Sequence, residues 1–149
     1  MKRRYQMLTV NNLANSTDGE VLVSIHLNGS TNHSTDGTQG LYGKLNKDSA
    51  FTKTMHAALW NSLNSTPGFI DFGVTNFASG VLLKSDMPAT MQETVFISDS
   101  DECVWLKDGT GNRQREIAGA LYAGLNDWFG QDNGGGGGKK CENPPCNNK

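Results

Sequence analysis

An apolar run from Val21 to Leu27, which carries a histidine near its end and is followed by an asparagine, constrains the fold of this chain more than any other segment. The run is strand-sized and bounded by polar residues and glycine, as expected of a buried β-strand. Side chains alternate along a strand, so one side would carry Leu22, Ser24, His26 and Asn28. His26 then lies near the carboxyl end of the strand, where open α/β sheets form their ligand sites.

A second predicted strand, within residues 87–98, carries one glutamate among apolar side chains. Glu93 alternates with Met91, Val95 and Ile97, so its carboxylate would share a layer with apolar groups. Partial desolvation would raise the pKa of Glu93 and suit it to proton transfer. The structural alternative is an exposed sheet edge or an ion pair with one of three cations, namely Arg113, Arg115 or Lys84.

Amphipathic helices are predicted from apolar residues at helical spacing. The first would begin at a cap, Asp48 or Ser49, and end before residues 64–68. Its apolar stripe consists of Phe51, Met55, Ala58, Leu59 and Leu63. The second would begin with Asn112 as its cap and end at Gly130. Its apolar positions are Ile117, Ala118, Leu121, Tyr122, Leu125, Trp128 and Phe129. A helix at the start of the chain is indicated by Met7, Val10, Leu13 and Ala14.

The other core elements are shorter. Residues 37–43 predict a strand that could pair beside the His26 strand, residues 69–79 an irregular loop, and residues 80–84 a short strand. Strands that alternate with amphipathic helices indicate an α/β fold, a layered sheet with flanking helices, over residues 1–130. Residues 131–149, which contain a five-glycine stretch, are expected to form a linker and a disordered tail.

Charge and cysteine content exclude several functional classes. The net charge is −2 and the charges are scattered, so neither a nucleic-acid partner nor a polybasic membrane surface is indicated. We expect no membrane span, and the first residues lack the apolar region of a secretory signal. Of the three cysteines, Cys141 and Cys146 are expected to pair locally, whereas Cys103 is expected to be a small buried hydrophobe.

His26 is of the residue type that binds zinc most often. A catalytic zinc ion uses three protein ligands and one open position, so His26 could supply one ligand. On spacing alone, a hydrogen-bonded structural histidine is the simpler interpretation. His33 and His56 are expected to be solvated rather than ligating. The indoles of Trp60, Trp105 and Trp128 could stack on a sugar, although Trp128 fits a core position better.

Three ordered motifs are shared with one enzyme family. They are Ser24-Ile-His-Leu-Asn28, Gly37-Thr-Gln-Gly-Leu-Tyr42, and Met87-Pro-Ala-Thr-Met-Gln-Glu-Thr-Val-Phe-Ile-Ser98 followed by Glu102. Over roughly residues 4–129 the chain resembles the zinc-dependent N-acetylmuramoyl-L-alanine amidases of the Amidase_3 type. This resemblance implies that His26 ligates zinc, that Glu93 is catalytic, and that Asn28 shapes the neighbouring wall by hydrogen bonding. The chain departs from the family pattern at Val95 and Asp99, where a glycine and an asparagine are usual.

The resemblance implies a cell-wall hydrolase that uses Zn²⁺ and acts on peptidoglycan, at the amide between N-acetylmuramic acid and L-alanine. The full-length parent is expected in the extracellular space or the cell envelope; its oligomeric state stays open. In the family, a histidine in a Gly-His-Gly segment and a glutamate also bind the metal, upstream of the first helix seen here. No Gly-His-Gly segment occurs in this chain. We therefore expect an incomplete amidase domain that lacks its amino-terminal strands.

Three alternatives remain at this point. The chain is a catalytically inactive fragment that acts as a wall-binding or regulatory module; or it is an unrelated metalloenzyme that completes its site with His33 and Asp36; or a companion chain supplies the missing ligands.

Overall fold

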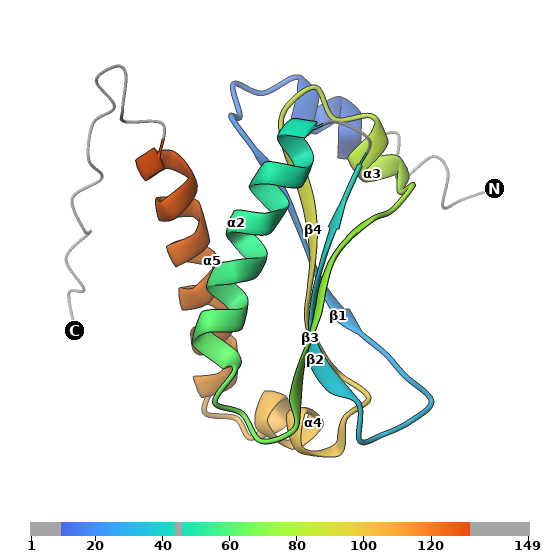
Figure 1. Cartoon of the computed structure of the whole chain (residues 1–149), viewed down its shortest axis with the longest axis vertical. Coiled ribbons are helices and arrows are strands. Elements are labelled where there is room, and N and C mark those ends of the chain that lie inside the picture. Colours follow the sequence, from blue (N-terminus) through green and yellow to red (C-terminus); the bar gives the residue numbers. More distant parts are fainter. Residues whose placement is uncertain (1–9, 44–45, 132–149) are drawn as a thin grey trace.

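The computed structural model describes residues 10–43 and 46–131. After a helical segment at residues 10–15, the elements are β1 (Leu22–Asn28), β2 (Asp36–Tyr42), α2 (Asn46–Leu63), β3 (Phe69–Asn76), α3 (Gly80–Leu83), β4 (Ala89–Phe96), α4 (Ser100–Lys107) and α5 (Asn112–Gln131). Figure 1 shows the strands as one layer with α2 and α5 side by side on one of its faces. The predicted α/β fold is therefore confirmed. Met7, both tail cysteines and the five-glycine stretch lie outside the described residues.

The four-stranded sheet has the order β1-β4-β2-β3. β4 is parallel to β1 and antiparallel to β2, and β2 is parallel to β3. The prediction that residues 37–43 pair beside the His26 strand is wrong, because β4 lies between the two. Almost every residue of β4 is buried, because β1 and β2 pair with both of its edges and side chains of other elements pack on its faces.

β1 is a strand, as predicted, but the expectation that it is buried is wrong. It lies at the edge of the sheet, and Ile25 and Leu27 are 60% and 43% exposed. Apolar periodicity identifies a strand without showing how many neighbours it has.

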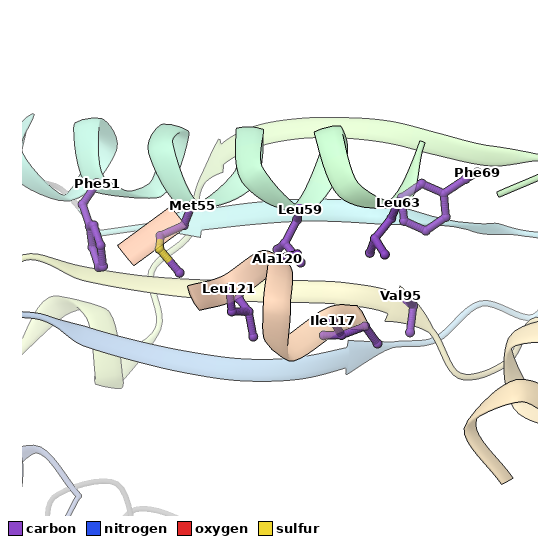
Figure 2. Packing of buried hydrophobic residues seen from close by; sticks show 9 residues of the cluster. All are labelled: Phe51, Met55, Leu59, Leu63, Phe69, Val95, Ile117, Ala120 and Leu121. Carbon is purple, nitrogen blue, oxygen red and sulfur yellow. The ribbon is translucent and has the colours of Figure 1, made fainter. Parts of the chain in front are cut away.

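The main core lies between the sheet and the α2–α5 pair. It contains Phe51, Met55, Leu59, Leu63, Phe69, Val95, Ile117, Ala120 and Leu121, as Figure 2 shows. The predicted apolar stripe of α2 is thus confirmed. The helix begins before the predicted cap: the buried Asp48 accepts a hydrogen bond from the N–H of Ala89 at 3.1 Å, which ties α2 to β4.

α5 also follows the prediction, within a residue or two at each end. Asn112 is its first residue rather than its cap, and the helix continues one residue past Gly130. The predicted inward face is too wide, since Tyr122 is 51% exposed and Ala118 is also exposed. No helix within the described ranges is long and apolar enough to cross a membrane.

Two shorter elements contradict the sequence-based expectations. Residues 69–76 form β3 instead of an irregular loop, and residues 80–83 form one helical turn instead of a strand. β3 is an edge strand with several exposed residues. Its apolar pattern is interrupted at Gly73, whose φ of 69° departs from extended backbone. The apolar run in α3 is too short for periodicity to distinguish a turn of helix from a strand.

Candidate active site

The predicted site residues His26 and Glu93 lie on neighbouring strands and face each other. Their Cα atoms are register partners in the parallel β1–β4 pair, and His26 Nδ1 lies 3.9 Å from Glu93 Oε1. This separation is longer than a hydrogen bond, so the two groups are in contact without sharing a proton directly. The His26 side chain is 47% exposed and that of Glu93 is 15% exposed, so both can be reached from solvent.

Both side chains project from the face of the sheet opposite α2. Gln92, the residue before Glu93, points toward α2, because its Nε2 donates to the carbonyl of Thr52 at 3.4 Å. Glu93 therefore points to the other face, where Met91 packs with Leu41. The α2–α5 core lies on the other face of the sheet, so it does not cover His26 and Glu93.

A β-bulge follows the two residues directly. The register passes from His26 opposite Glu93 to Asn28 opposite Phe96, so β4 carries one extra residue there. The hydroxyl of Thr94 donates to the carbonyl of His26 at 3.1 Å and holds this geometry. Bulges of this kind redirect side chains next to active sites.

The bulge corrects one sequence-based expectation. Val95 was expected on the same side as Glu93, but it is fully buried in the α2–α5 core. The extra residue turns Val95 toward the helices while Glu93 keeps the opposite face.

The environment of Glu93 favours its protonated form. Burial raises the pKa of the Glu93 carboxyl, and the nearby His26 offsets part of that shift. None of the three cations considered from the sequence pairs with it: Arg113 binds Glu102 and Glu116, Arg115 binds Asn112, and Lys84 makes no ion pair with it. Glu93 is thus a mostly buried carboxyl group whose ionisable neighbour is His26.

Asn28 lies at the carboxyl end of β1, two residues beyond His26. Its Oδ1 accepts the N–H of Gly29 at 2.8 Å, and its carbonyl accepts the N–H of Ile97 at 3.0 Å. The first contact is local to the loop that leaves β1, and the second joins the end of β1 to the residue after β4. A role for Asn28 in substrate binding stays a prediction.

The other histidines do not join this site. The ring of His33 is bonded through Nδ1 to the carbonyl of Ser98 at 2.8 Å, and Asp36 accepts the N–H of Phe96 at 3.1 Å. Within residues 10–43 and 46–131, no group of three His, Cys, Asp or Glu side chains is able to hold a metal ion. His33 and Asp36 therefore do not complete a metal site with His26. Among the described residues, the site offers zinc one nitrogen ligand, from His26.

His56 was expected to be solvated, which is wrong. It is 6% exposed, and its Nε2 lies 2.7 Å from Asp71 Oδ1, so it links α2 to β3. Its place beside the apolar stripe of α2 puts it against the sheet rather than in solvent. Cys103, expected to be buried, is a half-buried free thiol.

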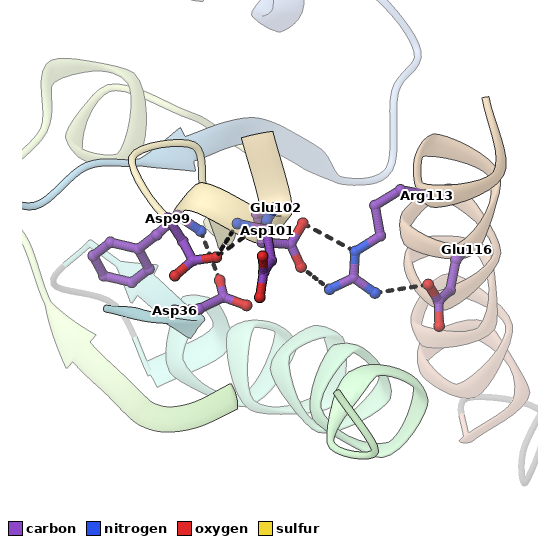
Figure 3. A network of polar contacts seen from close by, with 7 residues as sticks. Asp36, Asp99, Asp101, Glu102, Arg113 and Glu116 are labelled. Carbon is purple, nitrogen blue, oxygen red and sulfur yellow. Dashed lines mark hydrogen bonds and ion pairs between the residues drawn. The ribbon is translucent and has the colours of Figure 1, made fainter. Parts of the chain in front are cut away.

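A buried ion pair at the end of the sheet was not predicted. Glu102 on α4 is fully buried and accepts two hydrogen bonds from Arg113 on α5, which also binds Glu116 (Figure 3). The available signal was a capping pattern, since Asp99 accepts the N–H of Glu102 three residues later at 3.1 Å. That pattern locates the start of α4 but not the partner of Glu102.

Comparison with known proteins identifies the family. The Amidase_3 family model, N-acetylmuramoyl-L-alanine amidase, matches residues 4–127. The CwlD amidase from Clostridioides difficile, solved in complex with the GerS lipoprotein, is 23% identical with a TM-score of 0.76, covering 89% of this chain and 66% of that one. The catalytic domain of the amidase CwlV from Bacillus (Paenibacillus) polymyxa var. colistinus is 22% identical with a TM-score of 0.71, covering 83% and 65%.

An N-acetylmuramoyl-L-alanine amidase from Clostridium difficile 630 is similar to the same degree, with 24% identity, a TM-score of 0.72, and coverage of 83% of this chain and 65% of that chain. The chain thus spans 65–66% of the length of these three structures. No curated protein sequence matches it significantly. Since the family model covers most of the sequence and the fold agrees, the chain belongs to the N-acetylmuramoyl-L-alanine amidase family.

Proposed function

We propose that the protein containing this chain is a zinc-dependent cell-wall hydrolase that cleaves the amide between N-acetylmuramic acid and L-alanine in peptidoglycan. The observation that carries the proposal is the contact between His26 and Glu93 across the β1–β4 pair. It combines a metal-binding residue type and a mostly buried carboxyl group, as metal-assisted amide hydrolysis requires. The family match supports the substrate class.

In this proposal Glu93 moves the proton. Its carboxylate accepts a proton from a water molecule as that water attacks the amide carbonyl carbon, and then delivers the proton to the leaving nitrogen. The 3.9 Å separation allows one water molecule to contact both side chains. Partial burial of Glu93 strengthens its interaction with the water and with the developing charge.

His26 would hold the metal through one of its ring nitrogens. Zinc, when bound, would lower the pKa of a water molecule and polarise the carbonyl group. Further protein ligands are needed, because one donor does not hold zinc at catalytic affinity. We infer that they come from outside residues 10–43 and 46–131, as in an amidase domain of which residues 1–130 form one part.

The substrate implies a location. Peptidoglycan lies outside the cytoplasm, so we infer that the protein acts in the extracellular space or the cell envelope. Asn28, beside His26 at the carboxyl end of β1, would contribute to the wall of the substrate site.

The test compares metal content and hydrolysis in the protein that contains this chain. Replacing His26 by alanine should lower bound zinc and abolish the release of stem peptides with free L-alanine amino groups from purified peptidoglycan. His33→Ala is the matched control, because His33 is an exposed histidine bonded to Ser98, and it should change neither quantity. Unchanged zinc and hydrolysis in His26→Ala would refute the proposal.

One observation favours a second candidate, a catalytically inactive wall-binding or regulatory module. The part of the chain that the structure describes holds no group of three metal ligands. Zinc titration of the 149-residue chain by calorimetry separates the two functions. Micromolar or tighter binding that His26→Ala removes would exclude the inactive module. Absence of binding by the chain, together with no hydrolysis by the whole protein, would favour it.

A further inference from the structure

A cavity lies where α4, the start of α5 and the loop after α2 meet. Its volume is about 600 Å³, and it is lined by residues 65–67 together with Trp105, Asp108, Asn112, Arg113 and Glu116. Small-ligand sites commonly have volumes of about 300–1,000 Å³. None of these lining residues belongs to β1 or β4, so the His26–Glu93 site does not account for the cavity.

Trp105 gives the cavity an aromatic wall. Its surface is 36% exposed, whereas Trp60 and Trp128 pack against Phe69 and Phe51. The guanidinium of Arg113 lies 5.6 Å from the Trp105 ring centroid, which holds the indole in place. An exposed indole held in this way offers a flat apolar surface at little conformational cost.

The charged groups of the cavity are already compensated by the protein. Arg113 donates from Nε and Nη2 to Glu102 and from Nη1 to Glu116 (Figure 3). The carboxylate of Asp108 accepts the hydroxyl and the N–H of Thr110. An anionic ligand would meet no uncommitted guanidinium and two carboxylates, so the geometry disfavours phosphates and acidic peptides.

A neutral ligand rich in hydroxyl groups fits this arrangement better. Carboxylates have several acceptor positions each, and the Asn112 carboxamide and the hydroxyls of residues 65 and 66 supply donors as well as acceptors. A pyranose ring has an apolar face of C–H groups and a rim of hydroxyls. It can therefore cover the indole of Trp105 while its rim reaches Asp108, Asn112 and Glu116.

We propose that this cavity binds a sugar ring of a glycan chain. The choice of sugar rests on the proposed function, which makes a β-linked N-acetylhexosamine of the wall glycan the natural ligand. An acetamido group needs both a donor and an acceptor, and the Asn112 carboxamide can supply both types. The cavity would bind the glycan strand at a second place, outside the His26–Glu93 site, and so add to the affinity for peptidoglycan.

The experiment follows the three indole N–H signals by NMR while N,N′,N″-triacetylchitotriose is added to the full chain at millimolar concentration. The Trp105 signal should shift in a saturable way, and those of Trp60 and Trp128 should not. Trp105→Ala removes the reporting signal, so its loss of binding is measured by calorimetry with the same trisaccharide. Val104→Ala, a change at a 63% exposed neighbour on the same helix that does not line the cavity, should retain binding.

A second variant covers the case in which Trp105→Ala fails to fold. Ser65→Leu adds bulk at the cavity wall, keeps the indole, and should reduce binding at least tenfold. The proposal is overturned if the Trp105 signal does not saturate, or if choline binds in place of the trisaccharide. Equal binding of cellotriose, which lacks acetamido groups, would overturn the assignment of the ligand as an N-acetylhexosamine. Binding needs no metal, so it can fail while hydrolysis persists, and hydrolysis can fail while binding persists.

Discussion

Replacing Arg113 by methionine tests the energetics of the buried ion pair between α4 and α5. The side chains of Glu102 and Arg113 are 0% and 5% exposed, so neither charge is solvated. The change leaves the Glu102 carboxylate buried without its cation, which typically costs about 3–5 kcal/mol. Small domains have free energies of unfolding of about 5–15 kcal/mol, so the variant should lose a large part of its stability.

The pH dependence of this loss has a defined sign. Burial raises the pKa of Glu102 above its usual value of 4.5, and the hydrogen bonds from Arg113 offset only part of this. Without Arg113 the pKa rises further, and the folded state takes up a proton more readily than the unfolded state. The destabilisation should therefore be largest near neutral pH and shrink as the pH falls toward 4.5.

Urea unfolding monitored by circular dichroism measures both effects. The double variant Glu102→Leu, Arg113→Met removes both charges of the pair and should be more stable than Arg113→Met alone at neutral pH. Arg115→Met is the matched control, because this exposed arginine bonds to Thr110 and Asn112 at the surface and makes no ion pair with a buried carboxylate among the described residues. The reasoning is wrong if Arg113→Met loses less than about 1 kcal/mol, or if the double variant is no more stable than the single one.

Two further predictions concern helix packing. Gly119→Ala should raise the free energy of unfolding by about 0.5–1 kcal/mol, because this α5 glycine has open space around it and alanine favours the helix. Gly124→Ala should lower it by about 1 kcal/mol or more, because the added methyl would lie 3.1 Å from the Met55 Cα of α2; equal effects in thermal unfolding would contradict this. Asp71→Ala should cost about 1–3 kcal/mol, since the buried His56 Nε2 loses its partner. Burial alone would raise the pKa of Asp71, but the hydrogen bond from His56 holds this pKa below 3.8. The stability lost in Asp71→Ala should therefore persist down to pH values below 3.8 and disappear only in more acidic solution. A loss of stability that is confined to neutral pH would refute this prediction.

The elements with regular apolar periodicity were predictable from the sequence. α2 and α5 have stripes that the core buries, and β4 has an apolar run that the sheet encloses. β3 and α3 were not, because β3 is an interrupted edge strand and the apolar run of α3 is only one turn long. The order of the strands in the sheet was not predictable either, because the apolar pattern of a strand does not show which other strands pair with it.

The approach of His26 to Glu93 followed from the expectation that both lie at the ends of strands in one sheet. The bulge that separates Glu93 from Val95 did not, since it depends on how β4 matches β1. The Glu102–Arg113 pair was missed because the two residues lie on different helices, across a turn whose path the sequence does not specify. Side chains that meet through long-range packing need the structure.

Glu93→Gln in the protein that contains this chain tests the central claim most directly. The change keeps the size of the side chain and removes its ability to take up a proton. With zinc content and fold unchanged, the rate of stem-peptide release from peptidoglycan should fall by about 10²–10⁴-fold. Glu20→Gln, at an exposed glutamate before β1, should retain the full rate. Wild-type rates in Glu93→Gln would contradict the assignment of Glu93 as the proton carrier of the site.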